Sequence, residues 1–269
     1  MLLTSVIIVL REVLEAALLL SILLAMCRIL ELRRSWFYGA LACGVLGSVV
    51  YGLLLGPISE AADGVGQELL NAALQIALYG FLLVIALLLI ITARGSRRHL
   101  GLLQYAMLVS IALATLREGS EIFIYLMAFV PQQGLLPGVL SGALIGAGIG
   151  FSIGALFYYL LVELPRRYTL GVVLVLLTLV GSGLCLQAAQ QLIQADWLPS
   201  SAPVWDTSNL IGEDSLVGQL LYALLGYEAT PTAAEVTAYS LAAIPMIALS
   251  VMALYLSRKE RPDYVLHTE

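Results

Sequence analysis

The sequence predicts an all-α integral membrane protein with seven transmembrane helices. Of the 269 residues, 61 % are hydrophobic and only 12 % are charged, whereas soluble domains carry about 45–50 % apolar and about 25 % charged residues. The net charge of −5 provides no basic surface, which argues against binding to nucleic acid. The composition therefore indicates a protein that crosses the lipid bilayer several times.

Seven segments have the length and apolar character that a membrane-spanning helix requires, which is about 20 mostly apolar residues. The first segment has no basic residue ahead of its apolar run and has charges within it, so we expect a retained span rather than a signal peptide. The predicted spans are residues 2–27, 35–55, 70–93, 101–130, 134–161, 168–192 and 236–257.

The basic residues indicate how the chain is oriented. All but two of the 13 Lys and Arg residues lie in the first, third and fifth connections or in the tail at 258–269, and the other connections contain none. Basic residues mark the cytoplasmic side of a membrane protein. We therefore expect a multi-pass protein of the cytoplasmic (inner) membrane, with its N-terminus outside and its C-terminus in the cytoplasm.

The outer connections are acidic, and the longest of them, residues 193–235, is too polar to be a further span. Its apolar centre predicts a short helix that Asp214 caps and Gly226 ends. Asp206, Glu213 and Asp214 are candidates for an outer access site for cations; the alternative is that they are solvated loop residues or helix caps. The whole chain is expected to form one polytopic domain.

Two copies of one charged motif lie near the middle of apolar spans. Each copy reads R-E-x-x-E, at residues 11–15 and 117–121, although a charge in mid-membrane costs at least about 2.5–3.5 kcal/mol. Glutamates three positions apart share a helix face, and an arginine four positions before the second can pair with it. The predicted metal ligands are Glu12, Glu15, Glu118 and Glu121, with Arg11 and Arg117 as charge-compensating partners.

Such a cluster of carboxylates suits a divalent or trivalent hard cation. The alternative is that Arg–Glu pairs merely join two helices, but one glutamate per helix would be enough for that. Three cysteines within apolar runs and two histidines in loop and tail offer neither a disulfide framework nor a His-rich metal site. We expect no permanently bound cofactor.

The spacing of the motifs predicts an internal duplication. Equivalent positions are separated by three spans, and an odd number of spans inverts the second copy relative to the membrane. Residues 2–93 and 101–192 are therefore expected to be inverted repeats with a site at the midplane, and 236–257 is an additional helix. Glycines 142, 146, 150 and 154 are expected to pack against a neighbouring helix.

Seven spans with R-E-x-x-E in the first and fourth resemble the oxidase-linked iron permeases of fungi and their bacterial ferrous iron permease relatives, within the iron/lead transporter superfamily. The outer stretch 205–231 adds to this resemblance. It implies iron import through the motif glutamates, with extracytoplasmic iron-oxidising or iron-delivering partners. The family usually has glycine after the first glutamate, as at Gly119, whereas the first copy has Val13, whose side chain narrows that helix face.

Several alternatives remain open at this point. A proton-coupled carrier of Mn²⁺, Zn²⁺ or Pb²⁺ would use the same ligands, because carboxylates do not separate these ions sharply from iron. An intramembrane carboxylate enzyme is less favoured because Ser120 has only glutamates as neighbouring bases, and a non-transporting scaffold would lack a signalling surface. The valence of the iron, the coupling ion and a homo-oligomeric state are left open.

Overall fold

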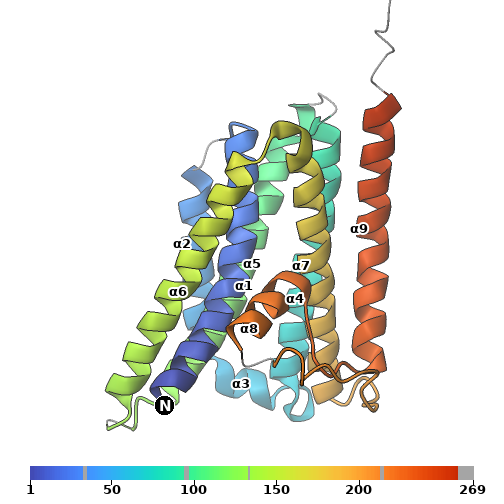
Figure 1. The fold of residues 1–269 in the computed structure, drawn as a ribbon. Coiled ribbons are helices and arrows are strands. Elements are labelled where there is room, and N and C mark those ends of the chain that lie inside the picture. The colour runs from blue at the N-terminus through green and yellow to red at the C-terminus, as the bar shows by residue number, and fades with distance from the viewer. Residues whose placement is uncertain (33–34, 94–96, 133, 213–214, 260–269) are drawn as a thin grey trace, which may run out of the picture.

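The computed structural model describes residues 1–32, 35–93, 97–132, 134–212 and 215–259 and is all-helical apart from loops and one isolated bridge within this part of the chain (Figure 1). Helices are the natural form here because a helix satisfies its own backbone hydrogen bonds in lipid. The long helices are α1 (Leu2–Ile29), α2 (Ser35–Leu53), α4 (Gly66–Ala93), α5 (Leu100–Met127), α6 (Leu136–Glu163), α7 (Arg166–Gln194) and α9 (Ala233–Lys259).

Six of these helices are long and apolar enough to cross a membrane, which confirms a multi-pass helical membrane protein. The seventh, α1, is as long as the others but carries three charged residues near its middle, Arg11, Glu12 and Glu15. The observed ends differ from the predicted ones by a few residues. The connection after α2 also contains two short helices that the sequence did not predict, α3 (Leu55–Glu60) and η1 (Ala62–Gly64).

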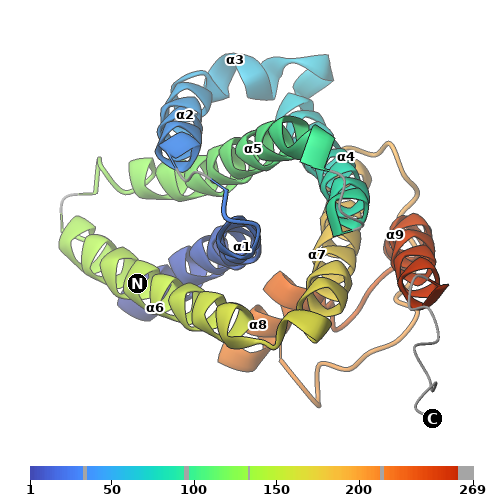
Figure 2. The same ribbon diagram turned by 90° about the horizontal axis from the view of Figure 1, so that it is seen from above.

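The long helices pack across the two halves of the chain rather than within them. The most extensive contacts join α1 to α6 and α2 to α5, while α4 packs against α7. Viewed from above, α1 lies inside a ring of α5, α4, α7 and α6, with α2 and α9 outside it (Figure 2). The helix α9 packs on α7 and, less extensively, on α4, so it lies beside the two halves.

Glycines allow α1 and α6 to approach closely, as the stripe on the fifth predicted span indicated. A Cβ on Gly142 or Gly146 would lie 2.5 Å from backbone oxygens of α1. A Cβ on Gly150 would lie 2.7 Å from Cγ1 of Val13. The valine after the first glutamate therefore does not keep the helices apart, because Gly150 on the facing helix has no side chain and leaves room for it.

The segment between α7 and α9, which the sequence predicts to lie outside, contains the predicted short helix, α8 (Leu216–Leu225). It ends at Gly226, whose φ of 65° is the left-handed conformation that glycine adopts without strain. The predicted cap is wrong, since Ser215 occupies the N-cap position and its hydroxyl accepts a hydrogen bond from the Gly218 amide at 3.0 Å. A serine hydroxyl at this position meets an otherwise unpaired amide. Glu213 and Asp214 lie outside the described residues.

Candidate metal centre

The two R-E-x-x-E motifs meet between α1 and α5, around the side chain of Arg117. This side chain is only 5 % exposed. Its Nη1 lies 3.0 Å from Oε2 of Glu15 and 2.5 Å from Oε1 of Glu118, and its Nη2 lies 3.2 Å from Oε1 of Glu121. One guanidinium therefore joins a glutamate of the first motif to both glutamates of the second.

Three carboxylates from the two motifs form a compact cluster. Glu12, Glu15 and Glu118 each offer one oxygen, and these three oxygens lie within 4.8 Å of one another. Glu12 is 6 % exposed and Glu118 is 4 % exposed, and Oε2 of each lacks a hydrogen-bond partner among the described residues. A buried carboxylate oxygen without a partner is costly. A hard cation with oxygen ligands would remove this cost.

The structure thus brings together the six ionisable residues that the sequence singled out, but not in equal roles. Glu121 lies outside the three-carboxylate cluster; its side chain is 29 % exposed and is paired with Arg117. The i,i+4 pairing expected within each motif is present in both, at 3.2 Å for Arg117 and Glu121 and at 3.5 Å for Arg11 and Glu15.

The other arginine, Arg11, faces the short outer helix. Its side chain is 38 % exposed, and its Cζ lies 4.1 Å from the centre of the Tyr222 ring. A guanidinium over a tyrosine face is a favourable cation–π contact. This contact places α8 directly against the charged residues of α1.

Two buried glutamines belong to the site and were not singled out from the sequence. Gln187 of α7 donates its Nε2 hydrogen to Oε2 of Glu15 at 2.9 Å, and Gln75 of α4 donates to Oε1 of Gln187 at 2.9 Å. Both residues are at most 4 % exposed. The sequence signal that could have found them is an amide side chain within an otherwise apolar span, because such a group needs a polar partner there.

Hollows border the carboxylates on two sides. One is lined by Glu15, Glu118 and Gln187, with Tyr222 of α8 in its wall. The other is lined by Glu12 and Glu118 together with residues of α2 and α6. Glu118 lines both hollows, so it stands between them.

The candidate outer access residues are only partly described. Asp206 lies in the loop before α8, is exposed, and accepts hydrogen bonds from the amide and hydroxyl of Ser208 at 3.0 and 2.6 Å. These two hydrogen bonds lower the pKa of Asp206. The structure does not place Asp206 in the carboxylate cluster. The three cysteines are free; Cys27 is buried, Cys185 is half-buried and Cys43 is exposed.

Comparison with known proteins supports the resemblance noted in the sequence. The model of the iron permease FTR1 family matches residues 67–261. This range covers most of the chain and includes the second motif, while the first motif lies before it. None of the curated proteins and none of the solved structures compared with the chain matches it. The chain belongs to the iron permease FTR1 family, a family of transporters rather than enzymes.

Proposed function

We propose that this protein imports iron across the cytoplasmic membrane and binds the ion through Glu12, Glu15 and Glu118. The observation that carries the proposal is the pair of buried carboxylate oxygens, one from each motif, that have no partner in the described residues and belong to one cluster. Hard oxygen ligands in this number suit an iron ion that has shed part of its water shell. Glu121 would receive or release the ion beside the cluster.

The role of Arg117 in this proposal is electrostatic. Without it, the glutamates around it would repel one another in a region of low dielectric, where like charges interact strongly. With it, four carboxylates still outnumber the two arginines when all of them are ionised, so the deprotonated cluster attracts a cation. The guanidinium also fixes Glu15 and Glu118 in position, so the protein need not reorganise them when the ion arrives.

The proposed transport step is alternating access at Glu118. This residue lines both hollows, one bordered by α4, α7 and α8 and the other by α2 and α6. A movement of one half of the chain against the other would change which hollow the ligands open to, and the proposal requires that this change also switches the membrane side from which they are accessible. The exchange of packing partners between halves, α1 with α6 and α5 with α2, is what two inverted repeats with a shared midplane site would produce.

We infer seven spans rather than six, with α1 included in spite of its charges. Its Arg11, Glu12 and Glu15 face other charged groups or an aromatic ring, which is how charges are accommodated in a membrane interior. With seven spans, the alternation of basic residues places the N-terminus outside and the C-terminus in the cytoplasm. Extracytoplasmic iron-oxidising or iron-delivering partners are a further element of the proposal, and Asp206 is a candidate capture residue on that side.

The direct test is uptake of radioactive iron into liposomes containing the purified protein. Fe²⁺ is kept reduced in one arm, and chelated Fe³⁺ is supplied in the other. We expect uptake of one valence, with losses of at least about 100-fold for Glu12→Gln and Glu118→Gln, because each variant removes a charged ligand from the cluster. Glu163→Gln, a change of an exposed carboxylate at the end of α6, is the matched control.

The outcomes distinguish the proposal from its alternatives. Full iron uptake by both motif variants would contradict the mechanism. If Mn²⁺, Zn²⁺ or Pb²⁺ inhibits the uptake of labelled iron at lower concentrations than unlabelled iron does, that ion is the preferred substrate. Uptake that appears only with an added iron-oxidising protein would show that delivery by a partner is required.

A further inference from the structure

The outer half of α7 carries a row of glutamines that begins at the carboxylate cluster. Positions three, four and seven residues apart lie on one helix face, and α7 has glutamine at 187, 190, 191 and 194. The innermost, Gln187, hydrogen-bonds Glu15 and lines the hollow beside Glu118. The outermost is exposed at the end of the helix. The row therefore connects the buried site with the outer end of the bundle.

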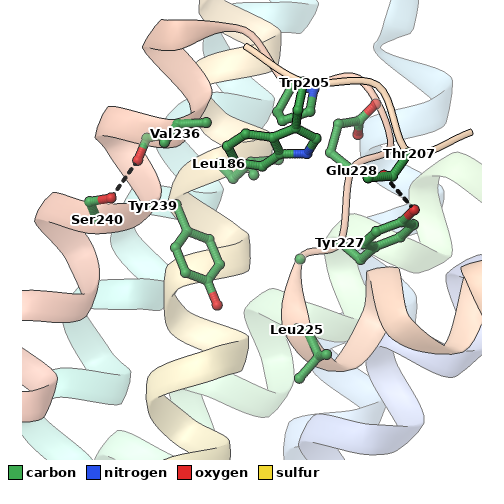
Figure 3. A pocket seen from close by; sticks show the side chains of 11 residues that line it. Leu186, Trp205, Thr207, Leu225, Tyr227, Glu228, Val236, Tyr239 and Ser240 are labelled. Atoms are coloured by element: carbon green, nitrogen blue, oxygen red, sulfur yellow. Dashed lines mark hydrogen bonds between the residues drawn. The ribbon is translucent and has the colours of Figure 1, made fainter. Parts of the chain in front are cut away.

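The outer part of this row reaches a second acidic residue. Gln190 donates its Nε2 hydrogen to Oε2 of Glu228 at 2.8 Å. Glu228 follows α8 and lines a pocket of about 400 Å³ between α7, the outer loop and α9 (Figure 3). Figure 3 shows its carboxylate to the right of Trp205 and above the hydrogen-bonded pair Thr207 and Tyr227. Among the described residues that line this pocket, Glu228 is the one with a carboxylate side chain.

Two glycines in close contact line the outer pocket and the inner hollow, one each. Gly226 lines the outer pocket and Gly183 lines the inner hollow. A Cβ on Gly226 would lie 2.5 Å from Cα of Gly183. The two spaces therefore come close to each other where the backbones of α7 and of the end of α8 are in contact.

We propose that Glu228, Gln190 and Gln187 form the outer route along which the cation reaches Glu15. This inference rests on the proposed transport function and assigns its access side. Glu228 supplies the charge that attracts the ion, and the glutamines supply neutral oxygens that replace its water without holding it tightly. A glutamine amide has both a donor and an acceptor, so Gln187 hydrogen-bonds Glu15 in the empty site and turns its oxygen to the ion in transit.

The buried partner of Gln187 fits this role. Gln75 holds Oε1 of Gln187 through its own amide hydrogen, while its Oε1 has no hydrogen-bond partner among the described residues and is fully buried. A group that served only to complete a static network would have both ends satisfied. The unpaired oxygen of Gln75 thus adds a second neutral oxygen next to Gln187.

The first test measures iron uptake by Glu228→Gln, Gln190→Leu and Gln187→Leu in the same liposomes. We expect the iron concentration for half-maximal uptake to rise about tenfold for the two outer variants, the loss of about one good polar contact, with the maximal rate retained. Gln187→Leu is expected to lower the maximal rate. The matched control, Gln104→Leu, changes a glutamine at the opposite end of the bundle in α5 and should behave as the unmodified protein.

The second test does not depend on transport. With the three native cysteines replaced, Gln190→Cys is exposed to a membrane-impermeant thiol reagent from outside. We expect labelling that iron slows, because the ion passes the labelled position. The route would be overturned if iron left the labelling rate unchanged and the outer variants kept the half-maximal iron concentration of the unmodified protein. The proposed function would still stand in that case, provided that Glu118→Gln abolished uptake. Normal uptake by Glu118→Gln would instead overturn the proposed function itself.

Discussion

The two R-E-x-x-E motifs have the same pattern but different environments. In the second copy, Arg117 is buried and contacts three carboxylates, whereas in the first copy Arg11 is 38 % exposed, lies 3.5 Å from one carboxylate and stacks on Tyr222. Two copies of one sequence motif therefore do not give corresponding residues equivalent contacts. The arginine of the second copy links the carboxylates of both motifs. The arginine of the first copy instead packs on Tyr222 of α8.

The largest difference between the copies should appear when each arginine is removed. Arg117→Leu leaves buried carboxylates without their counter-charge, which costs about 3–5 kcal/mol for a buried pair. Arg11→Leu removes one longer ion pair, at 3.5 Å, of a less buried side chain, so it should cost less than Arg117→Leu. The measurement is the unfolding free energy or thermal midpoint of each purified variant. Equal destabilisation by the two variants would show that the copies are equivalent after all.

The two motifs also differ in which of the two packed helices carries the glycine. At the first motif, Val13 of the motif helix α1 packs against Gly150 of α6. At the second motif the arrangement is reversed: the glycine, Gly119, is on the motif helix α5 and the side chain, Ser48, is on α2. A Cβ on Gly119 would lie 2.9 Å from Oγ of Ser48. Gly150→Ala is expected to cost about 1–3 kcal/mol through overpacking. Adding Val13→Gly should recover about 1 kcal/mol or more of that loss.

The mirror-image pair supplies the control for this cycle. Gly119→Ala should destabilise the protein, and Ser48→Gly should relieve that effect but not the effect of Gly150→Ala. Thermal unfolding of the four single variants and the four double variants, each rescue change with each glycine change, gives the coupling energies. If Val13→Gly and Ser48→Gly rescue both glycine variants alike, the packing at the two motifs is not specific to each.

A smaller effect is expected at the contact between Arg11 and α8. Tyr222→Phe keeps an aromatic face under the guanidinium, whereas Tyr222→Leu removes it, a loss of about 0.5–1 kcal/mol. We expect a change of about two- to fivefold in the iron concentration for half-maximal uptake with leucine and none with phenylalanine. Combining Tyr222→Leu with Arg11→Leu should add nothing further, and additive losses would contradict the proposed contact.

The first motif and the second could both be found in the sequence, and so could their approximate depth. The charges of Glu12 and Glu118 stand out because an apolar span seldom contains them, and the glycine stripe on the fifth predicted span indicated close packing. The ion pairs between residues of different spans could not be predicted from the sequence. That Arg117 also contacts Glu15, at 3.0 Å and in addition to the 3.5 Å contact of Arg11, depends on the mutual placement of α1 and α5, which local patterns do not specify.

Neutral polar residues account for most of what the sequence did not predict. Gln75 and Gln187 carry no charge, so they did not stand out in a count of ionisable groups, and their role emerges only from hydrogen bonds between distant helices. The cap of α8 was assigned to Asp214 because aspartate is a strong N-cap residue. The adjacent Ser215 is an equally good cap, and the turn geometry decides between them.

The smallest expected effect concerns the outer loop, where Asp206 is far less constrained than the buried glutamates. Hydrogen bonds from Ser208 lower the pKa of Asp206, so its carboxylate stays charged at pH values where an ordinary aspartate, with a pKa near about 3.9, takes up a proton. Ser208→Ala removes one of these bonds and should raise that pKa. Iron capture should then weaken slightly at an external pH of about 4 and not at neutral pH, as initial uptake rates at low iron would show.

The central claim is that both motifs build one shared ion site, and equilibrium iron binding to the purified protein tests it most directly. The account predicts one tightly bound ion per chain in the unmodified protein and loss of that ion in either Glu12→Gln or Glu118→Gln. Two bound ions per chain, with each variant losing one and keeping the other, would contradict the account, because each motif would then hold an ion by itself.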